Sequence, residues 1–380
     1  MEKLKKELVE LRRELHQNPE ASGEEARTAR LIRSYLSRYE PDKIITGLGG
    51  HGVAAIYNGK VPGPTVLFRC ELDGLPITEQ NDLPYKSNNT GFGHLCGHDG
   101  HMSMVAGLAS LLNEQRPEKG RVLLLFQPSE ENGKGADLVI RDEKFSTIKP
   151  DYSFALHNLP GFAMHEIIIK NPVFAASSRG LSVFLKGKSS HAAEPENGKN
   201  PSMTVARIIS EIDELMGDED QFGDFTLITP IHVKVGSLAF GTSPGEAEMH
   251  FTLRSFTDED MDKLSAMVLQ IIRDTCEKDG IHSMVNFHEE FPVTRNTGEE
   301  IKLVERVAER NNFEMKHLEE PFKWSEDFGH FTNLSAGAIF GLGSGNNTAA
   351  LHNPEFDFPD ELIITGVRMF KGIYEEILNH

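Results

Sequence analysis

The chain has 380 residues, enough for two domains, and its composition (38% hydrophobic, 26% charged) is that of an ordinary globular protein. The formal net charge of −19 argues against binding to nucleic-acid phosphates or to an anionic membrane surface. Three widely spaced cysteines (Cys70, Cys96 and Cys276) argue against a disulfide framework. Since no apolar run is long enough to cross a bilayer, we expect a cytoplasmic protein that binds neither nucleic acid nor membranes.

The first half of the chain reads as an α/β arrangement. An amphipathic helix opens it and ends before Pro19; its leucines recur at helical spacing, and it is too polar for a signal peptide. A second helix is predicted over 102–115. Short apolar runs are predicted to be buried strands, at 53–57, 65–68, 122–126 and 153–156. Strands that alternate with helices favour a sheet with helices on its faces.

From about residue 180 the pattern changes to that of an α+β unit. Strands are predicted at 181–186, 225–235, 246–256 and 283–290, and helices at 201–216 and 258–279. This order is βαββαβ, the split ferredoxin-like motif. The strand at 336–343 resumes the earlier style. We therefore expect a discontinuous α/β catalytic domain with a mixed sheet, formed by 1–177 and 291–380, interrupted by a ferredoxin-like domain at 178–290.

Side chains that bind metals follow the strands of the larger domain. They are Glu71 and Asp73 after the strand at 65–68, Glu130 and Glu131 after 122–126, His157 after 153–156, and His352 after 336–343. In open α/β sheets, ligands bind outside the carboxyl ends of the strands. Each residue alone is explained as well by a solvated turn or a buried polar group. Together they indicate a metal site at one sheet edge.

The stretch GHLCGHDGHMSM, at 93–104, adds a cysteine and three histidines just before the predicted helix. Cys96 and His98 are two residues apart and do not share a helix face, but a glycine-flanked turn lets both reach one point. Asp99 is predicted to cap the helix, whose N-terminus would favour a thiolate at Cys96. His94 and His101 are interpreted as buried structural residues.

Several motifs together resemble those of the M20 metallopeptidases, nearly from end to end: CELDGLP, GHLCGHDGH, FQPSEENGKGA, GKSSHAAEPENGKNP, SEDFGHF and LHNP. The closest branch is the amidohydrolases that cleave N-acyl amino acids, such as hippurate hydrolase and the plant auxin-conjugate hydrolases. The resemblance implies hydrolysis of the amide bond of an N-acyl amino acid, which releases a carboxylic acid and a free amino acid.

The resemblance also implies the site residues. Two divalent transition metal ions (Zn, Mn, Co or Ni) would be held by Cys96, which bridges them, and by His98, Glu131, His157 and His352. Glu130 would be the general base for a water that the metals activate. His191 and Arg254 of the smaller domain would contact the substrate. One thiolate and one carboxylate leave two divalent ions with net positive charge, which favours a substrate with a free carboxylate.

The sequence departs from the family pattern at two places, and the resemblance also implies a partner subunit. Gly241 stands where the family usually has a substrate-facing Asn, and CELDGLP replaces ADxDALP but keeps acids at Glu71 and Asp73. In several relatives the histidine that matches His191 reaches the active site of a partner subunit. We therefore expect a homodimer formed through the smaller domain.

Three other interpretations stay open. An M20-type dipeptidase or carboxypeptidase would share the fold and the metals. Cys96 could instead be a nucleophile with His98 as its base, although no third group orients the pair. A metal-binding scaffold without catalysis would make Glu130 dispensable.

Overall fold

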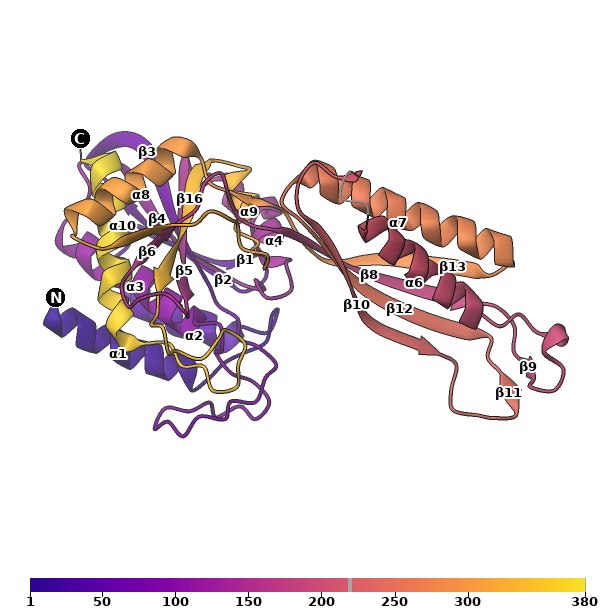
Figure 1. The fold of residues 1–380 in the computed structure, drawn as a ribbon. Helices are drawn as coiled ribbons and strands as arrows, with labels where there is room; N and C mark the ends of the chain where they lie inside the picture. The colour runs from indigo at the N-terminus through magenta and orange to yellow at the C-terminus, as the bar shows by residue number, and fades with distance from the viewer. Residues whose placement is uncertain (218–220, 380) are drawn as a thin grey trace. The chain divides into compact units, whose positions relative to one another are not determined.

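The computed structural model describes residues 1–217 and 221–379, which form two compact units (Figure 1). Unit 1 comprises Met1–Phe174, Thr294–Glu320 and Asp327–His380, and unit 2 comprises Ala175–Val293 and Pro321–Glu326. The short segment 321–326 ends with Ser325 and Glu326, the first two residues of the SEDFGHF motif. It joins unit 2 because the backbone N–H of Ala176 donates to the carbonyls of Phe322 (3.0 Å) and Trp324 (3.1 Å).

Unit 1 is built around a mixed eight-stranded sheet, which confirms the predicted mixed sheet. Its order is β1 (Lys43–Leu48), β2 (Gly52–Asn58), β4 (Lys119–Gln127), β3 (Val61–Glu71), β5 (Tyr152–Leu159), β16 (Ala336–Gly343), β6 (Ile167–Ile169) and β15 (Met315–His317). The central strands β4, β3, β5 and β16 are parallel, whereas β1, β2 and β6 pair antiparallel with their neighbours β2, β4 and β16. The carboxyl ends of four parallel strands therefore meet at one edge.

Helices cover both faces of this sheet (Figure 1). The main core joins one face to α1 (Glu2–His16), α2 (Ala26–Ser37), α3 (His98–Glu114), α8 (Gly298–Arg310) and α10 (Ile363–Leu378). The shorter helices α4 (Gly135–Arg141), α5 (Glu143–Ser146) and α9 (Gly329–Thr332) cover the other face. In β4, Val122 and Leu124 belong to the main core while Leu123 is equally buried on the opposite face. Burial on both faces explains why these strands read as continuous apolar runs.

Unit 2 is an antiparallel sheet with two helices on one face. The sheet order is β10 (Thr226–Val235), β12 (Glu246–Ser255), β8 (Ser177–Lys186) and β13 (His282–Phe291). Along the chain these strands alternate with α6 (Ser202–Met216) and α7 (Asp258–Asp279) in the order βαββαβ. In β12 the apolar residues Ala247, Met249, Phe251 and Leu253 are buried against the helices, and the residues between them are half-exposed. This alternation is the one that its sequence predicts.

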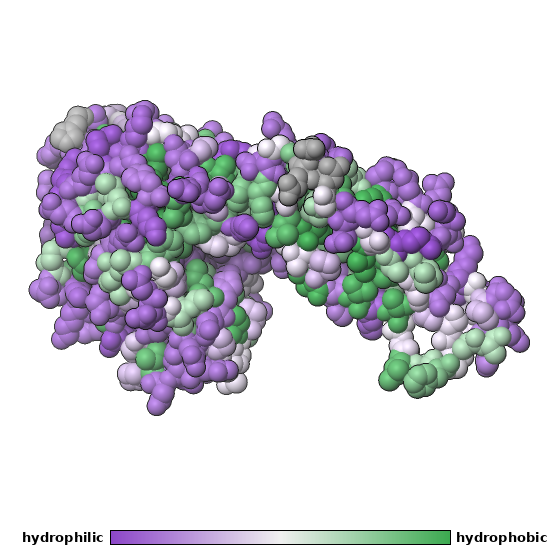
Figure 2. Space-filling view, in the orientation of Figure 1, coloured by the Kyte–Doolittle hydropathy of each residue, from purple (hydrophilic) through white to green (hydrophobic). Residues whose placement is uncertain are grey.

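Unit 2 also exposes several large apolar side chains (Figure 2). Ile231 and Val233 of β10 and Met284 of β13 are exposed on the strands. Leu238 and Phe240 are 93% and 94% exposed at the tip of an arm that precedes β11 (Thr242–Ser243). The arm is held by pairing of β11 with β9 (Ser190–His191), which is followed by the short helix η1 (Pro195–Asn197).

The remaining elements are β7 (Val173–Ala175), which pairs with β14 (Thr294–Arg295), and the short helix η3 (Asp360–Leu362). Among the described residues, every helix is too short or too polar to cross a bilayer.

Candidate metal and active site

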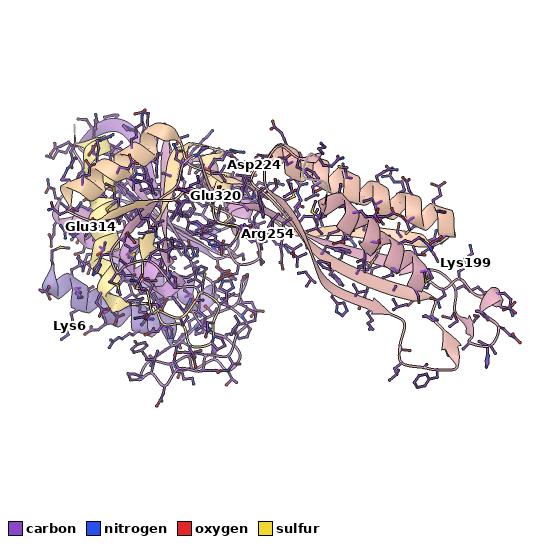
Figure 3. The ribbon with its side chains drawn as sticks, in the orientation of Figure 1. Lys6, Lys199, Asp224, Arg254, Glu314 and Glu320 are labelled. Carbon is purple, nitrogen blue, oxygen red and sulfur yellow. The ribbon has the colours of Figure 1, made fainter. Side chains whose placement is uncertain are left out.

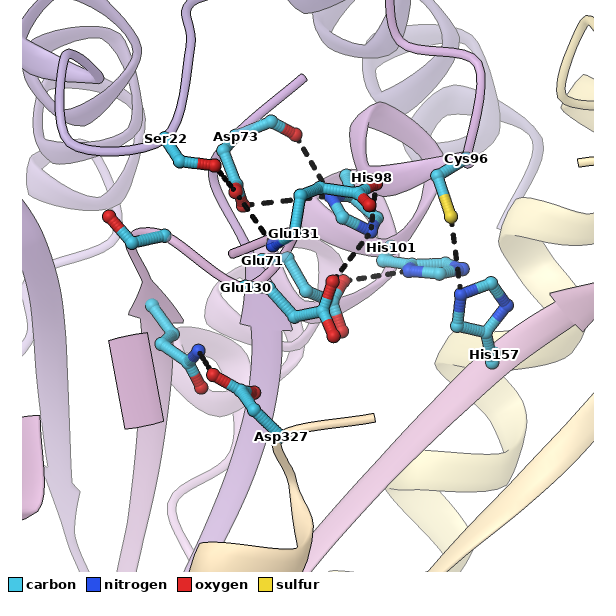
Figure 4. Close-up of polar contacts among 12 residues, drawn as sticks. Ser22, Glu71, Asp73, Cys96, His98, His101, Glu130, Glu131, His157 and Asp327 are labelled. Carbon is cyan, nitrogen blue, oxygen red and sulfur yellow. Dashed lines mark hydrogen bonds and ion pairs between the residues drawn. The ribbon is translucent and has the colours of Figure 1, made fainter. Parts of the chain in front are cut away.

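Of the predicted strand-end residues of unit 1, Glu71, Asp73, Glu130, Glu131 and His157 lie together at one edge of its sheet (Figure 4). Glu71 is the last residue of β3, and Glu130 and Glu131 lie in the loop after β4. His157 lies inside β5, which continues to Leu159, so the strand is longer than the apolar run that predicted it. His352 lies in the loop that follows β16.

Cys96 belongs to two clusters of potential metal ligands. The first cluster is Cys96, His98 and His157, and the second is Cys96, Glu131 and His352. Within each cluster the ligand atoms lie within 4.8 Å of one another. A third cluster joins His98 to Glu130 and Glu131. Two sets of donors that share one thiol are suited to holding a pair of metal ions.

Backbone carbonyls orient two of the histidines. The Nδ1 atom of His98 donates to the carbonyl of Asp73 (2.8 Å), and Nδ1 of His157 donates to the carbonyl of Asn158 (2.9 Å). The Nε2 atoms are left to face the cluster. His157 Nε2 lies 3.5 Å from Cys96 Sγ, and His98 Nε2, which is buried and makes no hydrogen bond, lies 3.7 Å from Glu131 Oε1. Ligating histidines in metalloproteins are held by this kind of outer hydrogen bond, so the donor set fits a metal.

The charges around the cluster favour a cation. Burial lowers the pKa of His98, but the nearby carboxylates, Glu71 foremost, more than offset it and raise this pKa to about 9. Burial, with a smaller contribution from His101, lowers the pKa of His157 to about 3. Burial also lowers the pKa of His352. The carboxylates that stabilise a proton on His98 would equally stabilise a bound metal ion.

Gly97 shapes the loop that presents the two ligands from the α3 side. It has a φ of 94°, a region that other residues avoid, and a Cβ added there would meet Asn158 Oδ1 at 2.2 Å. The turn therefore requires glycine between Cys96 and His98. This confirms the interpretation of GHLCGHDGHMSM as a glycine-dependent turn that runs into a helix.

Behind the cluster lies a buried polar network that extends through Glu71. Arg69 pairs with this carboxylate, and His101 Nδ1 lies 2.7 Å from Glu71 Oε2 while its Nε2 lies 2.7 Å from Asn158 Oδ1. Burial alone would raise the pKa of Glu71, but Arg69 and His101 hold it well below its usual range. His101 is therefore buried and hydrogen-bonded. His94 is also buried, but neither of its ring nitrogens makes a hydrogen bond.

The prediction that Asp99 caps α3 is wrong. Gly97 occupies the N-cap position, and no side chain caps the helix. The Asp99 carboxylate points the other way, where its Oδ2 lies 2.8 Å from Arg12 Nε and 2.8 Å from His16 Nδ1. A buried arginine offers a full counter-charge, which a helix N-terminus does not. Sequence reasoning missed Arg12 and His16, whose only signal was a four-residue spacing beside the leucines of α1.

The remaining predicted residues lie in unit 2, whereas the three clusters named above lie in unit 1. His191 is exposed and pairs with Thr242 through the two-stranded sheet, and Gly241 faces open space. Arg254 lies near the end of β12, far along unit 2 from Lys199 (Figure 3). It donates to the carbonyl of Lys323 (2.8 Å) and to Ser325 Oγ (3.0 Å). These contacts hold the segment 321–326. The substrate roles of His191 and Arg254 stay predictions.

Comparison with known proteins identifies the class to which this fold and donor set belong. The sequence profile of Peptidase family M20/M25/M40 matches residues 67–376, and the chain belongs to this family of hydrolases. It is 28% identical to an N-acetylcysteine deacetylase of Bacillus subtilis (96% of this chain, 94% of the relative). It is 30% identical to an N-acetyldiaminopimelate deacetylase of Exiguobacterium sibiricum (97% and 98%).

A solved structure shows the same relationship. A dinuclear metal binding peptidase of the M20 family from Bacillus subtilis superposes with a TM-score of 0.84 at 26% identity, covering 100% of this chain and 99% of the other.

Proposed function

We propose that this protein is a metal-dependent amidohydrolase that cleaves the amide bond of N-acyl amino acids and releases a carboxylic acid and a free amino acid. The observation that carries this proposal is the pair of ligand clusters that share Cys96 at the carboxyl edge of the sheet. Membership of the M20/M25/M40 family supports hydrolysis, and two relatives named as deacetylases of N-acetylated amino acids support the substrate class.

In this proposal two divalent ions bind at the clusters. Cys96 would bridge them, and the other ligands would be His98, His157, Glu131 and His352. A thiolate with imidazole and carboxylate donors suits Zn, Mn, Co or Ni better than Ca or Mg. When bound, the ions would supply Lewis-acid polarisation of the scissile carbonyl and a lowered pKa for the attacking water.

Glu130 is the proposed general base. Its side chain is 8% exposed, and its Oε2 lies 4.0 Å from His98 Nε2, beside the ligands but outside both clusters that share Cys96. A carboxylate in this place can take a proton from the attacking water and deliver it to the leaving amine. Glu131 belongs to the cluster with Cys96 and His352 whereas Glu130 does not, so the two adjacent residues can act as ligand and base.

The substrate is proposed to carry a free carboxylate, because one thiolate and one carboxylate leave two divalent ions with net positive charge. His191 and Arg254 are the proposed contacts of unit 2, and Gly241 leaves more room there than the usual Asn. A dipeptidase or carboxypeptidase would use the same unit 1 residues. The two functions must therefore be distinguished by which substrates the protein cleaves.

The test compares N-acetyl amino acids with dipeptides of the same residues, after chelation and after addition of each metal. We expect chelation to abolish hydrolysis, metal to restore it, and N-acetyl amino acids to have the higher kcat/KM. Activity that survives chelation would support Cys96 as a nucleophile instead. A higher kcat/KM for dipeptides would support the peptidase, and no hydrolysis of either with metal bound would support a scaffold.

We also propose a homodimer formed through unit 2. The support is that β10 and β13 are sheet edges and carry exposed Ile231, Val233 and Met284. Open edges and apolar patches favour pairing with a second copy across a two-fold axis. Light scattering on the purified protein tests this, and a monomer at micromolar concentration would contradict it.

A further inference from the structure

Arg12 is a buried cation of α1 that pairs with two different loops. Its side chain has no exposed surface, its Nε lies 2.8 Å from Asp99 Oδ2, and its Nη2 pairs with Asp357. Asp360 completes the set at 3.5 Å from Nη1. The three carboxylates more than offset the effect of burial on the pKa of Arg12, so it stays charged.

Both loops carry proposed metal ligands. Asp99 directly follows His98 in the first turn of α3, and Asp357 belongs to the same loop as His352. This second loop has no regular secondary structure between β16 and η3, and His352 itself has a φ of 65°. A non-glycine residue in that region needs its surroundings to hold it there.

Other contacts also hold the 352–357 loop: the backbone N–H of Gln80 donates to the Pro354 carbonyl (2.8 Å), Asn81 Nδ2 donates to the Phe356 carbonyl (2.9 Å), and the Phe356 side chain is buried in the main core. The backbone N–H of His352 donates to the Leu95 carbonyl (2.8 Å), and Tyr85 Oη donates to Asp357 Oδ2 (2.8 Å). Tyr85 itself lies under the Arg12 guanidinium, which is 5.0 Å from its ring centre. Arg12 is thus a charged group that pairs both with Asp99, which follows His98, and with Asp357 of the loop that carries His352.

We infer that Arg12 is a positioning residue that fixes the separation of the two ligand-bearing loops and thereby sets the metal affinity of the site. A guanidinium is suited to this because its planar fork holds two carboxylates in fixed directions, which a lysine ammonium does not. Removing it would leave the buried Asp99 paired with His16 but not with Arg12, and Asp357 without its guanidinium, so the two loops would lose the group that joins them and would move apart or take in water. This inference rests on the proposed metal centre.

The test is titration of the metal-free, full-length protein with Co²⁺, followed by visible absorption. Arg12→Gln should weaken Co²⁺ binding by about tenfold or more, the range found when groups that support metal ligands are removed. Asp357→Asn should shift the affinity in the same direction. Because Asp357 is 28% exposed, this milder variant carries the test if Arg12→Gln does not fold.

Two controls separate positioning from a general loss of stability. Arg13→Gln removes an exposed neighbour that pairs with Asp360 (2.7 Å), and Leu378→Ala opens a buried cavity at the end of α10. Both should leave Co²⁺ affinity unchanged, although Leu378→Ala should lower Tm.

The inference is overturned if Arg12→Gln and Asp357→Asn bind Co²⁺ as tightly as the wild type. It is also overturned if Leu378→Ala weakens binding as much as Arg12→Gln does. Failure of the wild type itself to bind Co²⁺ would instead remove the proposed function, and this inference with it.

Discussion

His352 Nε2 lies 3.7 Å from Glu131 Oε2, although the two residues come from opposite halves of the chain. This distance is too long for a hydrogen bond. It is close to the roughly 3.4 Å that separates two ligands each about 2.1 Å from one tetrahedral ion. Glu131 is nearly buried and His352 is 49% exposed, so one lies on the protein side of the site and the other at its open side.

Removal of a proposed ligand should remove metal as well as activity. We expect Cys96→Ala and His352→Ala to lose at least one of the two ions, because each takes a donor from a three-residue cluster. Metal content of the folded variants measures this. His317→Ala, which removes an exposed histidine paired with Glu305, is the matched control and should keep both ions. Two ions per chain in Cys96→Ala or His352→Ala would show that the ligand assignment is wrong.

Glu130→Ala should separate catalysis from metal binding. The variant is expected to keep both ions and its substrate affinity while kcat falls by about two orders of magnitude or more, as the loss of a general base does. Metal analysis and steady-state kinetics on one preparation measure both. Near-normal turnover would rule out the role of Glu130 as base.

Gly97→Ala should disturb the turn between two proposed ligands. An alanine Cβ would meet Asn158 Oδ1 at 2.2 Å, in addition to the cost of a positive φ, which is about 1–3 kcal/mol. Gly91→Ala is a matched control, because Gly91 has nearly the same φ (93°) but open space around it. The free energy of unfolding in urea and the metal content should both fall further in Gly97→Ala than in Gly91→Ala. Equal losses in the two variants would show that the contact with Asn158 is unimportant.

Stability should depend on pH through His16. Burial lowers its pKa, but hydrogen bonds to Asp99 and Glu79 raise it to about 9, above the ordinary 6.5. The protonated ring therefore stabilises the fold fully below pH 6.5, and this contribution is lost as the pH rises through 9. At pH 6 we expect the unfolding free energy of the wild type to exceed that of His16→Gln by an amount on the order of 3 kcal/mol, and its Tm to be higher accordingly. Both differences should shrink by pH 9.5. A gap that is constant or grows with pH would contradict this.

Complementation tests whether His191 acts in a partner subunit. Chains carrying Glu130→Ala are co-expressed with chains carrying His191→Ala, and the mixed dimer is purified. If His191 acts in trans, one of the two sites keeps both residues and the other lacks both, so about half the activity should return. If it acts in cis, both sites lack one residue and the mixed dimer stays inactive. Full activity of the His191→Ala homodimer would show that this histidine has no role.

The sequence by itself determined five of the eight strands of the unit 1 sheet (β2, β3, β4, β5 and β16) and the edge at which Glu71, Glu130, Glu131 and His157 gather. Strands buried on both faces leave long apolar runs, and the polar residues that follow them must lie at the carboxyl edge of a parallel block. The alternation in β12 likewise specified which side of the unit 2 sheet is buried, because side chains alternate between faces along a strand.

Only the tertiary structure decided which partner each polar group takes. Asp99 stands where a helix cap is expected, yet it pairs with Arg12 and His16 of α1, and Arg254 holds the segment 321–326 through Lys323 and Ser325. Capping depends on neighbours in the chain and leaves a local pattern. A buried ion pair forms between elements that the fold brings together, and the cost of burying an unpaired charge, rather than any sequence spacing, selects its partners.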